Sequence, residues 1–352
     1  MTDATSSAPL RVGVASLVEH PMDQLAGSGR TLESLGYSNI WVPDERLLRN
    51  VYVSLATLAG ATERIGLGTA VTNPYTRHPA ITAAAIATID ELSGGRTTLA
   101  LGAGGGLGAY GITRTSPVQA LRETTEIVRR LTSNETVSYD GTLFSLVSTQ
   151  LDFPALRPVP IYLAGRGPKI LQLAGEIADG AIIGGFADAS GIGYAQQMIH
   201  RGMERAGRNE SEVDQLAWLY VSASPDRAAA RAAVSKIVLA SLVTSRPILG
   251  ELGLDVPKSL LDHLDSTGWA FPRETPAQAS ALLPDHLVDA FAVYGTPAEC
   301  VERLRAVQAC GISHVCFVLF PAEGDTVATL AQRLAVEVVS RLRESNAREP
   351  LG

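Results

Sequence analysis

A short glycine-rich segment near the middle of the chain has the residue types of a phosphate site. Residues 164–169 read Ala164-Gly165-Arg166-Gly167-Pro168-Lys169, between an apolar run and a stretch of helical periodicity. Pro168 suits the first turn of a helix, and the free backbone N–H groups of such a turn attract anions. Arg166 and Lys169 add positive charge there. The segment therefore predicts a phosphate-binding turn, and the alternative is a tight turn with solvated charges.

A second glycine cluster follows another apolar run. It reads Leu101-Gly102-Ala103-Gly104-Gly105-Gly106, and residues 106–111 satisfy the pattern GxGxxG. The next helical stretch begins only near Pro117, which is too late for a dinucleotide-binding fingerprint. We interpret these glycines as positions where a planar ligand approaches the backbone closely.

Side chains for metal or nucleophilic catalysis form no motif in this sequence. HxxxH, Gly-x-Ser-x-Gly and GxxxxGK[ST] are all absent, and the three cysteines, Cys300, Cys310 and Cys316, have no CxxC spacing and suggest buried thiols. His78 directly precedes a helical stretch, which suits a cap or core-edge role better than catalysis. A phosphate site without acid–base machinery of its own suggests that a bound cofactor carries out the reaction.

The composition is that of an ordinary globular protein. The 352 residues are 46% hydrophobic and 18% charged, and 36 acidic against 29 basic residues give a net charge of −7. The sequence has no basic run, no long apolar window and no basic-then-apolar leader at its start. We therefore expect a cytoplasmic protein with a small-molecule substrate and neither nucleic acid nor membrane as a partner.

Short apolar runs alternate with longer segments of helical period, as in βα units around a parallel sheet. The eight runs are Leu10–Leu17, Ser38–Pro43, Ile65–Val71, Thr97–Ala103, Pro160–Ala164, Gly180–Gly184, Leu216–Ala223 and His314–Phe320. Eight such units predict a (β/α)8 TIM barrel of the α/β class. An open doubly wound sheet with a second domain is the alternative, and the absence of a linker favours one closed domain over residues 1–352.

Two segments of the chain are additions to the strands and helices of a minimal barrel. Residues 136–153 alternate like strands around Asp140-Gly141, which predicts a β-hairpin with a type I′ turn. Residues 245–290 are rich in Pro and Leu with uneven period, which predicts a helical insertion between strands seven and eight.

Catalytic and ligand groups of a β/α barrel lie at the carboxyl ends of its strands. That rule selects Ser16, Glu19, Asp44, Glu45, Thr69 to Asn73, Gly102 to Gly106, Ala164 to Lys169, Gly184 to Phe186, Ser222 and Pro321.

Several of these segments together resemble the luciferase-like (bacterial luciferase) superfamily, and most closely its deazaflavin-dependent oxidoreductases, which include the methylenetetrahydromethanopterin reductases. The segments are Gly66–Pro79 (GLGTAVTNPYTRHP), Thr88–Arg96 (TIDELSGGR), Trp41–Asp44 (WVPD), Leu101–Gly104 (LGAG), Pro160–Lys169 (PIYLAGRGPK) and Ala178–Gly180 (ADG). The resemblance implies a homodimeric barrel that binds coenzyme F420 and transfers a hydride, with a cis peptide bond at Ala70–Val71.

The resemblance also implies roles for individual residues. Asp44 would hydrogen-bond the polar edge of the coenzyme ring, with Glu45 beside it as an acid–base candidate. The cofactor-binding residues would be Asp44, Thr69, Ala70, Val71, Thr72, Gly102, Ala103, Gly104, Ala164, Gly165, Arg166, Gly167, Lys169, Gly184 and Gly185. Ala70 and Val71 would support the ring, and Arg166 and Lys169 would bind the phosphate tail. No metal is expected.

The sequence departs from the methanopterin reductases at two places. Acidic residues of those enzymes are replaced here by Ala15 and by Gly104 to Gly106, and Asp44-Glu45 stands where many relatives have Asp-His. Glu45 or Glu19 could take over acid–base work, or either could simply be solvated. The expected reaction is reduction of a C=C, C=N or C=O bond. Two alternatives remain, an FMN-dependent two-component monooxygenase and a non-catalytic cofactor-binding subunit.

Overall fold

The structure, a computed structural model, describes residues 10–15 and 21–348, with side chains as far as residue 344. Ser16 and Glu19, two candidates from the sequence, lie outside the described residues. The chain divides into two compact units. Unit 1 comprises Met1–Val12, Ile183–Gln196 and Gln215–Gly352, and unit 2 comprises Gly13–Ile182 and Gln197–Asp214. The single domain expected from the sequence therefore stays a prediction.

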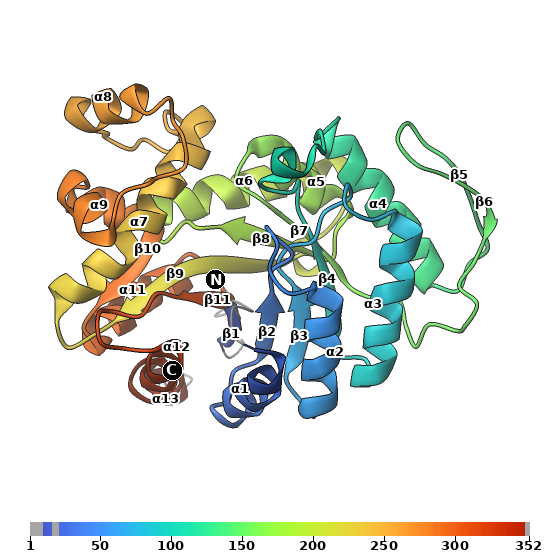
Figure 1. Cartoon of the computed structure of the whole chain (residues 1–352), viewed down its shortest axis with the longest axis horizontal. Coiled ribbons are helices and arrows are strands. Elements are labelled where there is room, and N and C mark those ends of the chain that lie inside the picture. Colours follow the sequence, from blue (N-terminus) through green and yellow to red (C-terminus); the bar gives the residue numbers. More distant parts are fainter. Residues whose placement is uncertain (1–9, 16–20, 349–352) are drawn as a thin grey trace, which may run out of the picture. The chain divides into compact units, whose positions relative to one another are not determined.

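Nine strands form one parallel sheet in the order β10-β9-β11-β1-β2-β3-β4-β7-β8, and β9 also pairs with β8 (Figure 1). The strands are β1 (Arg11–Ala15), β2 (Asn39–Val42), β3 (Gly66–Thr69), β4 (Thr97–Leu101), β7 (Ile161–Gly165), β8 (Gly180–Gly184), β9 (Asp214–Ala223), β10 (Ala292–Gly295) and β11 (His314–Leu319). β1 and β8 each continue from one unit into the other. Within unit 1, Arg11 N–H donates to the Ser313 carbonyl at 2.9 Å and Gly185 N–H to that of Trp218 at 3.0 Å. The eight predicted strands and the (β/α)8 barrel order are confirmed, and the open-sheet alternative is wrong.

Helices follow the strands in the expected rhythm. They are α1 (Met22–Ser34), α2 (Val51–Ala61), α3 (Pro79–Ser93), α4 (Pro117–Thr132), α5 (Pro168–Ile177), α6 (Ala189–Ala206), α7 (Arg227–Ser245) and α11 (Pro297–Ala309). Local sequence sets their ends: Gly94 adopts the left-handed conformation that closes α3, and Thr296 with Glu299 forms a capping box at the start of α11. His78 caps α3 by accepting from Ala80 N–H at 3.2 Å, as its position predicted.

The predicted hairpin exists, but its turn differs from the expected one. β5 (Val137–Asp140) pairs antiparallel with β6 (Ser145–Thr149), with Asp140 opposite Ser145. Neither Asp140 nor Gly141 has the positive φ that a type I′ turn requires, so that prediction is wrong. Residues 141–144 form a longer loop because the buried Glu123 of α4 accepts three of its N–H groups, from Thr142 (2.7 Å), Leu143 (3.0 Å) and Phe144 (2.9 Å).

The segment between β9 and β11 is helical, as expected. It contains α8 (Lys258–Ser266), α9 (Pro276–Leu282) and α10 (Asp285–Phe291). The strand β10, which the sequence reading missed, follows α10 and precedes α11. The last helical stretch is not a uniform α-helix: α12 (Val327–Arg333) continues through a π-helical turn at Leu334–Val339 into α13 (Ser340–Arg348).

Helix α7 is long and apolar enough to pass a length-and-composition test for a membrane span over Arg227–Ile248. Half of its apolar window is buried. It packs against α9 and β10 of the same unit, so its composition is that of a core helix.

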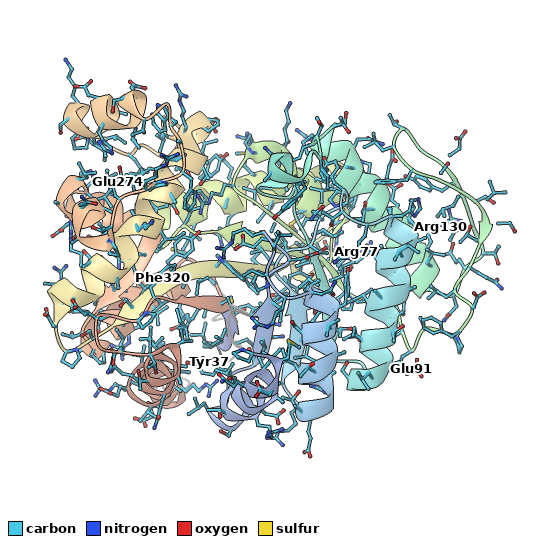
Figure 2. All side chains as sticks on the ribbon, in the orientation of Figure 1. Tyr37, Arg77, Glu91, Arg130, Glu274 and Phe320 are labelled. Carbon is cyan, nitrogen blue, oxygen red and sulfur yellow. The ribbon has the colours of Figure 1, made fainter. Side chains whose placement is uncertain are left out.

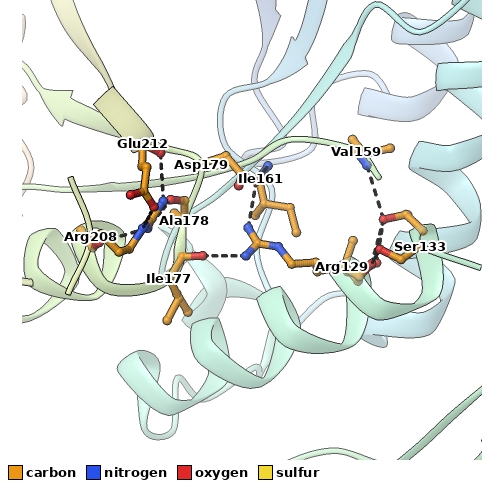
Figure 3. A network of polar contacts seen from close by, with 12 residues as sticks. Arg129, Ser133, Val159, Ile161, Ile177, Ala178, Asp179, Arg208 and Glu212 are labelled. Carbon is orange, nitrogen blue, oxygen red and sulfur yellow. Dashed lines mark hydrogen bonds and ion pairs between the residues drawn. The ribbon is translucent and has the colours of Figure 1, made fainter. Parts of the chain in front are cut away.

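In unit 2, arginine side chains form hydrogen bonds with the end of α5 and with the residues just before β8 (Figure 3). Arg129 donates to the Ile177 carbonyl at 2.9 Å and pairs with Asp179 at 2.8 Å, and Asp179 accepts from Ile161 N–H at 2.8 Å. Arg208 donates to the Ala178 carbonyl at 2.7 Å. These bonds satisfy carbonyls that helix α5 leaves at its C-terminus.

Two glycines bring α5 and α6 into backbone contact in unit 2. A Cβ on Gly175 would lie 2.0 Å from the Ile199 carbonyl oxygen, and a Cβ on Gly202 would lie 1.9 Å from that of Gln172. Only glycine fits at either position without moving a helix.

Candidate functional site

Two residues directly after β3 interrupt its pairing with β4, although Ala70 N–H still donates to the Val42 carbonyl of β2 at 2.7 Å. The hydroxyl of Thr69 donates to the Ala100 carbonyl at 2.7 Å and accepts from Ala100 N–H at 2.8 Å, so a side chain replaces a backbone partner there. The ladder resumes where Thr72 N–H donates to the same carbonyl at 3.0 Å. Ala70 and Val71, between them, are joined by a cis peptide bond, as the resemblance implied. Thr69 and Thr72 are fully buried, so their side chains hold the shape of this bulge.

Asp44, which follows β2, is held by two partners. Its Oδ2 accepts from the Thr72 hydroxyl at 2.7 Å and from Arg77 at 2.6 Å. The Arg77 guanidinium also lies 4.9 Å from the centre of the Tyr52 ring (Figure 2 labels Arg77). The side chains of Asp44 and Arg77 are 18% and 22% exposed, so the ion pair is largely withdrawn from water and weakly screened. Oδ1 of Asp44 has no partner among the described residues and can accept from a ligand.

The sequence reading missed Arg77 and Tyr52 as members of this site. Burial raises the pKa of Tyr52, and the nearby Arg77, the next influence, lowers it. The phenol is therefore neutral at pH 7. An ion pair such as Asp44–Arg77, which joins the end of β2 to the loop before α3, has no fixed sequence spacing. The one sequence feature that could have indicated Arg77 is its place in the motif Gly66–Pro79.

The glycines after β4 make room for neighbouring side chains. A Cβ on Gly102 would lie 2.6 Å from Val71 Cγ2, and a Cβ on Gly104 would lie 2.7 Å from Leu107 Cδ1. Gly105 and Gly106 have open space around the missing Cβ. We predicted that a planar ligand approaches the backbone at Gly102 and Gly104. In the structure, the side chains of Val71 and Leu107 occupy the space where a Cβ would lie at these two glycines. Contact of Gly102, Ala103 and Gly104 with a cofactor stays a prediction.

The loop that contains these glycines is tethered to the segment after the bulge. The Tyr75 hydroxyl donates to the Thr115 carbonyl at 3.0 Å, and Arg114 donates to the Gly104 carbonyl at 3.1 Å. Asn73 Oδ1 accepts from the N–H groups of Tyr75 and Thr76, which turns the chain after the bulge.

The predicted phosphate turn follows β7 in unit 2. Gly167 is extended at the N-cap of α5 and Pro168 is its first residue, so the helix starts with unpaired N–H groups. A Cβ on Gly165 would lie 2.8 Å from Ile170 Cγ2, which explains that glycine. Lys169 is exposed and Arg166 is half-buried. The Ala164 carbonyl is 3.8 Å from the Cβ position of Gly102, so turn and bulge are neighbours.

Other candidates are less clearly connected to this group. Glu45 is half-exposed and pairs with Arg46 at 3.4 Å. Gly184 and Gly185 lie at the end of β8 in unit 1, where Gly185 has a φ of +69°. Cys300 and Cys316 are buried as expected, whereas Cys310 is partly exposed. Among residues 10–15 and 21–344, no three His, Cys, Asp or Glu side chains gather as metal ligands.

Comparison with known proteins gives consistent matches along the chain. Residues 4–314 match the model of a family described as luciferase-like monooxygenase. A 5,10-methylenetetrahydromethanopterin reductase of Archaeoglobus fulgidus is 36% identical over 317 residues, which cover 88% of this chain and 93% of the relative. An F420-dependent glucose-6-phosphate dehydrogenase of Microbacterium testaceum is 27% identical over 354 residues, covering 96% and 98%.

Solved structures show the same fold. The coenzyme F420-dependent tetrahydromethanopterin reductase of Methanopyrus kandleri superimposes with a TM-score of 0.81 at 24% identity, covering 95% of this chain and 100% of that one.

Proposed function

Because the chain belongs to the luciferase-like monooxygenase family, we propose that it is a coenzyme F420-dependent oxidoreductase acting on a small organic substrate. The observation that carries this proposal is the bulge after β3, which the buried Thr69 and Thr72 hold in place, with Asp44 bound to Thr72 and Gly102 close to both Val71 and the Ala164 carbonyl. When bound, the coenzyme supplies a ring carbon that exchanges a hydride.

The residues of unit 2 fit such a coenzyme in chemical character. Oδ1 of Asp44 can accept from an N–H on the polar edge of the ring, while Arg77 and Thr72 keep the carboxylate oriented through Oδ2. Lys169, Arg166 and the first N–H groups of α5 suit the phosphate tail. Gly184 and Gly185, which the resemblance also assigned to the tail, belong to unit 1.

Rate enhancement in this proposal comes mainly from position. The protein would hold the substrate carbon and the ring carbon in a reactive geometry and exclude water, which can account for about 7–11 kcal/mol of a barrier. By the resemblance, the acidic residues of the methanopterin reductases have no counterpart at Ala15 or at Gly104 to Gly106, and we assign proton transfer in this chain to Glu45 or to water. The substrate bond is a C=C, C=N or C=O bond.

The test is a titration of the purified protein with coenzyme F420, followed by coenzyme fluorescence. Saturable binding, and oxidation of the reduced coenzyme in the presence of an acceptor, would support the proposal. Absence of any spectral or fluorescence change would overturn it. Oxygen-dependent turnover with reduced FMN would instead identify a monooxygenase, because a deazaflavin does not activate oxygen. Tight binding without turnover across a broad substrate panel would indicate a non-catalytic subunit.

A further inference from the structure

The helical insertion of unit 1 contains a cavity that is lined by none of the residues proposed to bind the coenzyme. Its volume is about 320 Å³, at the small end of the range for small-molecule sites. Leu239 of α7 and Leu264 of α8 form its apolar wall with Phe271 and Pro272. His263, Arg273 and Glu274 form its polar end and also line a second, more open hollow next to it.

The turn that closes one side of the cavity is held in an unusual conformation. Helix α8 is followed by Gly268 and Trp269, both left-handed, with φ values of +63° and +55°. A left-handed tryptophan is rare and persists where contacts fix it. The Trp269 indole N–H donates to Asp265 at 2.8 Å, and the Arg246 guanidinium lies 4.6 Å from the indole ring centre. These contacts give the segment after Trp269 a defined starting point.

The other end of that segment is fixed as well. Thr275 caps α9 in a reciprocal box with Gln278, in which Thr275 N–H donates to Gln278 at 2.9 Å and Gln278 N–H to Thr275 at 3.3 Å. Residues 270–274 therefore span two anchored positions. A segment held at both ends keeps the cavity open before any ligand arrives, which lowers the cost of binding.

The charges at the polar end leave one cation available. His263 Nε2 lies 2.7 Å from Glu274 Oε1 (Figure 2 labels Glu274). The N–H of Glu274 itself and His263 lower the pKa of Glu274, so this carboxylate is charged and already satisfied. Arg273 is exposed, and no side chain in the described part of the insertion pairs with its guanidinium. An incoming anion would therefore meet Arg273 without displacing an existing partner.

An apolar side chain is left exposed beside this cation. Phe271 is 66% exposed, although the next residue, Pro272, is buried. Covering this apolar surface favours binding, by a free energy of roughly 25 cal/mol for each 1 Å² that a ligand removes from water. A ligand with a flat apolar body would cover Phe271 and fill the space against Leu264.

We propose that this cavity binds a small molecule with an apolar ring or chain and a single carboxylate or sulfonate. The apolar body lies against Leu264 and Phe271, and the anionic group pairs with Arg273. The residues of this site differ from those proposed to bind the coenzyme, so the two proposals are tested by different variants.

The test uses the fluorescent dye 1-anilinonaphthalene-8-sulfonate, which has this chemistry, with the full-length protein and saturating coenzyme F420. We expect one saturable site with energy transfer from Trp269, which is reduced in Trp269→Phe because Trp41 and Trp218 remain as donors. Arg273→Gln should weaken binding about tenfold, the usual effect of losing one charge-assisted hydrogen bond. Arg64→Gln, an exposed arginine in unit 2, serves as the matched control and should change nothing.

Two further arms keep the test decisive. Ala270→Phe, introduced at an exposed lining position, should block the dye while leaving the melting temperature unchanged. 1-Naphthoate should displace the dye, and the neutral 1-naphthalenemethanol should not. Equal displacement by both compounds, or unchanged dye affinity in Arg273→Gln and Ala270→Phe, would overturn the proposal.

Discussion

Arg77 lies 2.6 Å from the carboxylate of Asp44 and stacks at 4.9 Å on the ring of Tyr52. Losing the guanidinium would leave a largely buried carboxylate with Thr72 as its one described partner, a cost of about 1–3 kcal/mol. We expect Arg77→Gln to weaken coenzyme F420 binding about tenfold. Fluorescence titration measures the dissociation constant.

The control for that prediction is a double-mutant cycle. Asp44→Asn and Arg77→Gln act on one pair, so their effects on binding should be less than additive when combined. Strict additivity would mean that the two residues act independently, contrary to the proposed positioning role of Arg77.

Lys169 should contribute through the phosphate tail alone. Lys169→Gln is expected to reduce affinity for the intact coenzyme about five- to tenfold, and less at high salt because an exposed charge is screened. A deazaflavin that lacks the phosphate tail should bind the variant and the wild type equally. Lys258→Gln, an exposed lysine at the start of α8, is the matched control. Equal losses for both ligands would place Lys169 elsewhere than at the tail.

Gly102 should be intolerant of a side chain because of Val71. A Cβ there would lie 2.6 Å from Val71 Cγ2, so Gly102→Ala forces the bulge to move, at a typical cost of about 1–3 kcal/mol. Thermal unfolding and coenzyme titration should both show the loss. Val71→Ala in the same chain should restore part of the stability, and failure of that rescue would show that a different contact excludes alanine.

Glu123 should stabilise the hairpin in a pH-dependent way. Burial acts to raise the pKa of Glu123, but Gln119 and the N–H groups of residues 142–144 outweigh it, so the net pKa is lowered. A lowered folded-state pKa gives stability that is complete above the unfolded value of about 4.3 and disappears as the pH falls through the folded value. Glu123→Gln should therefore cost about 2–3 kcal/mol at pH 7 and less below pH of about 4.

Chemical unfolding at the two pH values tests this. Glu135→Gln is the control, since its exposed pair with Arg130 should contribute less than about 1 kcal/mol. A destabilisation by Glu123→Gln that is the same at both pH values would contradict the charged-acceptor role of Glu123.

The barrel strands could be predicted because burial imposes a regular pattern on local sequence. The apolar runs at residues 160–164 and 314–320, for example, coincide with β7 and β11 to within a few residues. The start of a helix can be predicted equally well where the capping residues are close in sequence, as with Thr296 and Glu299 at the start of α11. The glycine turn at Gly167 and Pro168 was found for the same reason.

The missed features depend on contacts between distant residues. The type I′ turn failed because Glu123, about 20 residues earlier, binds the loop backbone. Strand β10 is only four residues long and follows α10 directly, so no periodicity marks it. Arg77 and Tyr52 join Asp44 through folding alone. Gly102 and Val71 were both named as candidate cofactor-binding residues, but their contact with each other was not predicted.

The paired glycines of α5 and α6 place the same steric limit on two positions that lie far apart in the sequence. Since Gly175 faces the Ile199 carbonyl and Gly202 faces that of Gln172, a methyl group at either site would push the same two helices apart. Helix α5 begins at Pro168, so such a shift would travel along its axis to the turn at Gly167. A relative with alanine at one of these positions should therefore carry compensating changes on the other helix, far from any ligand.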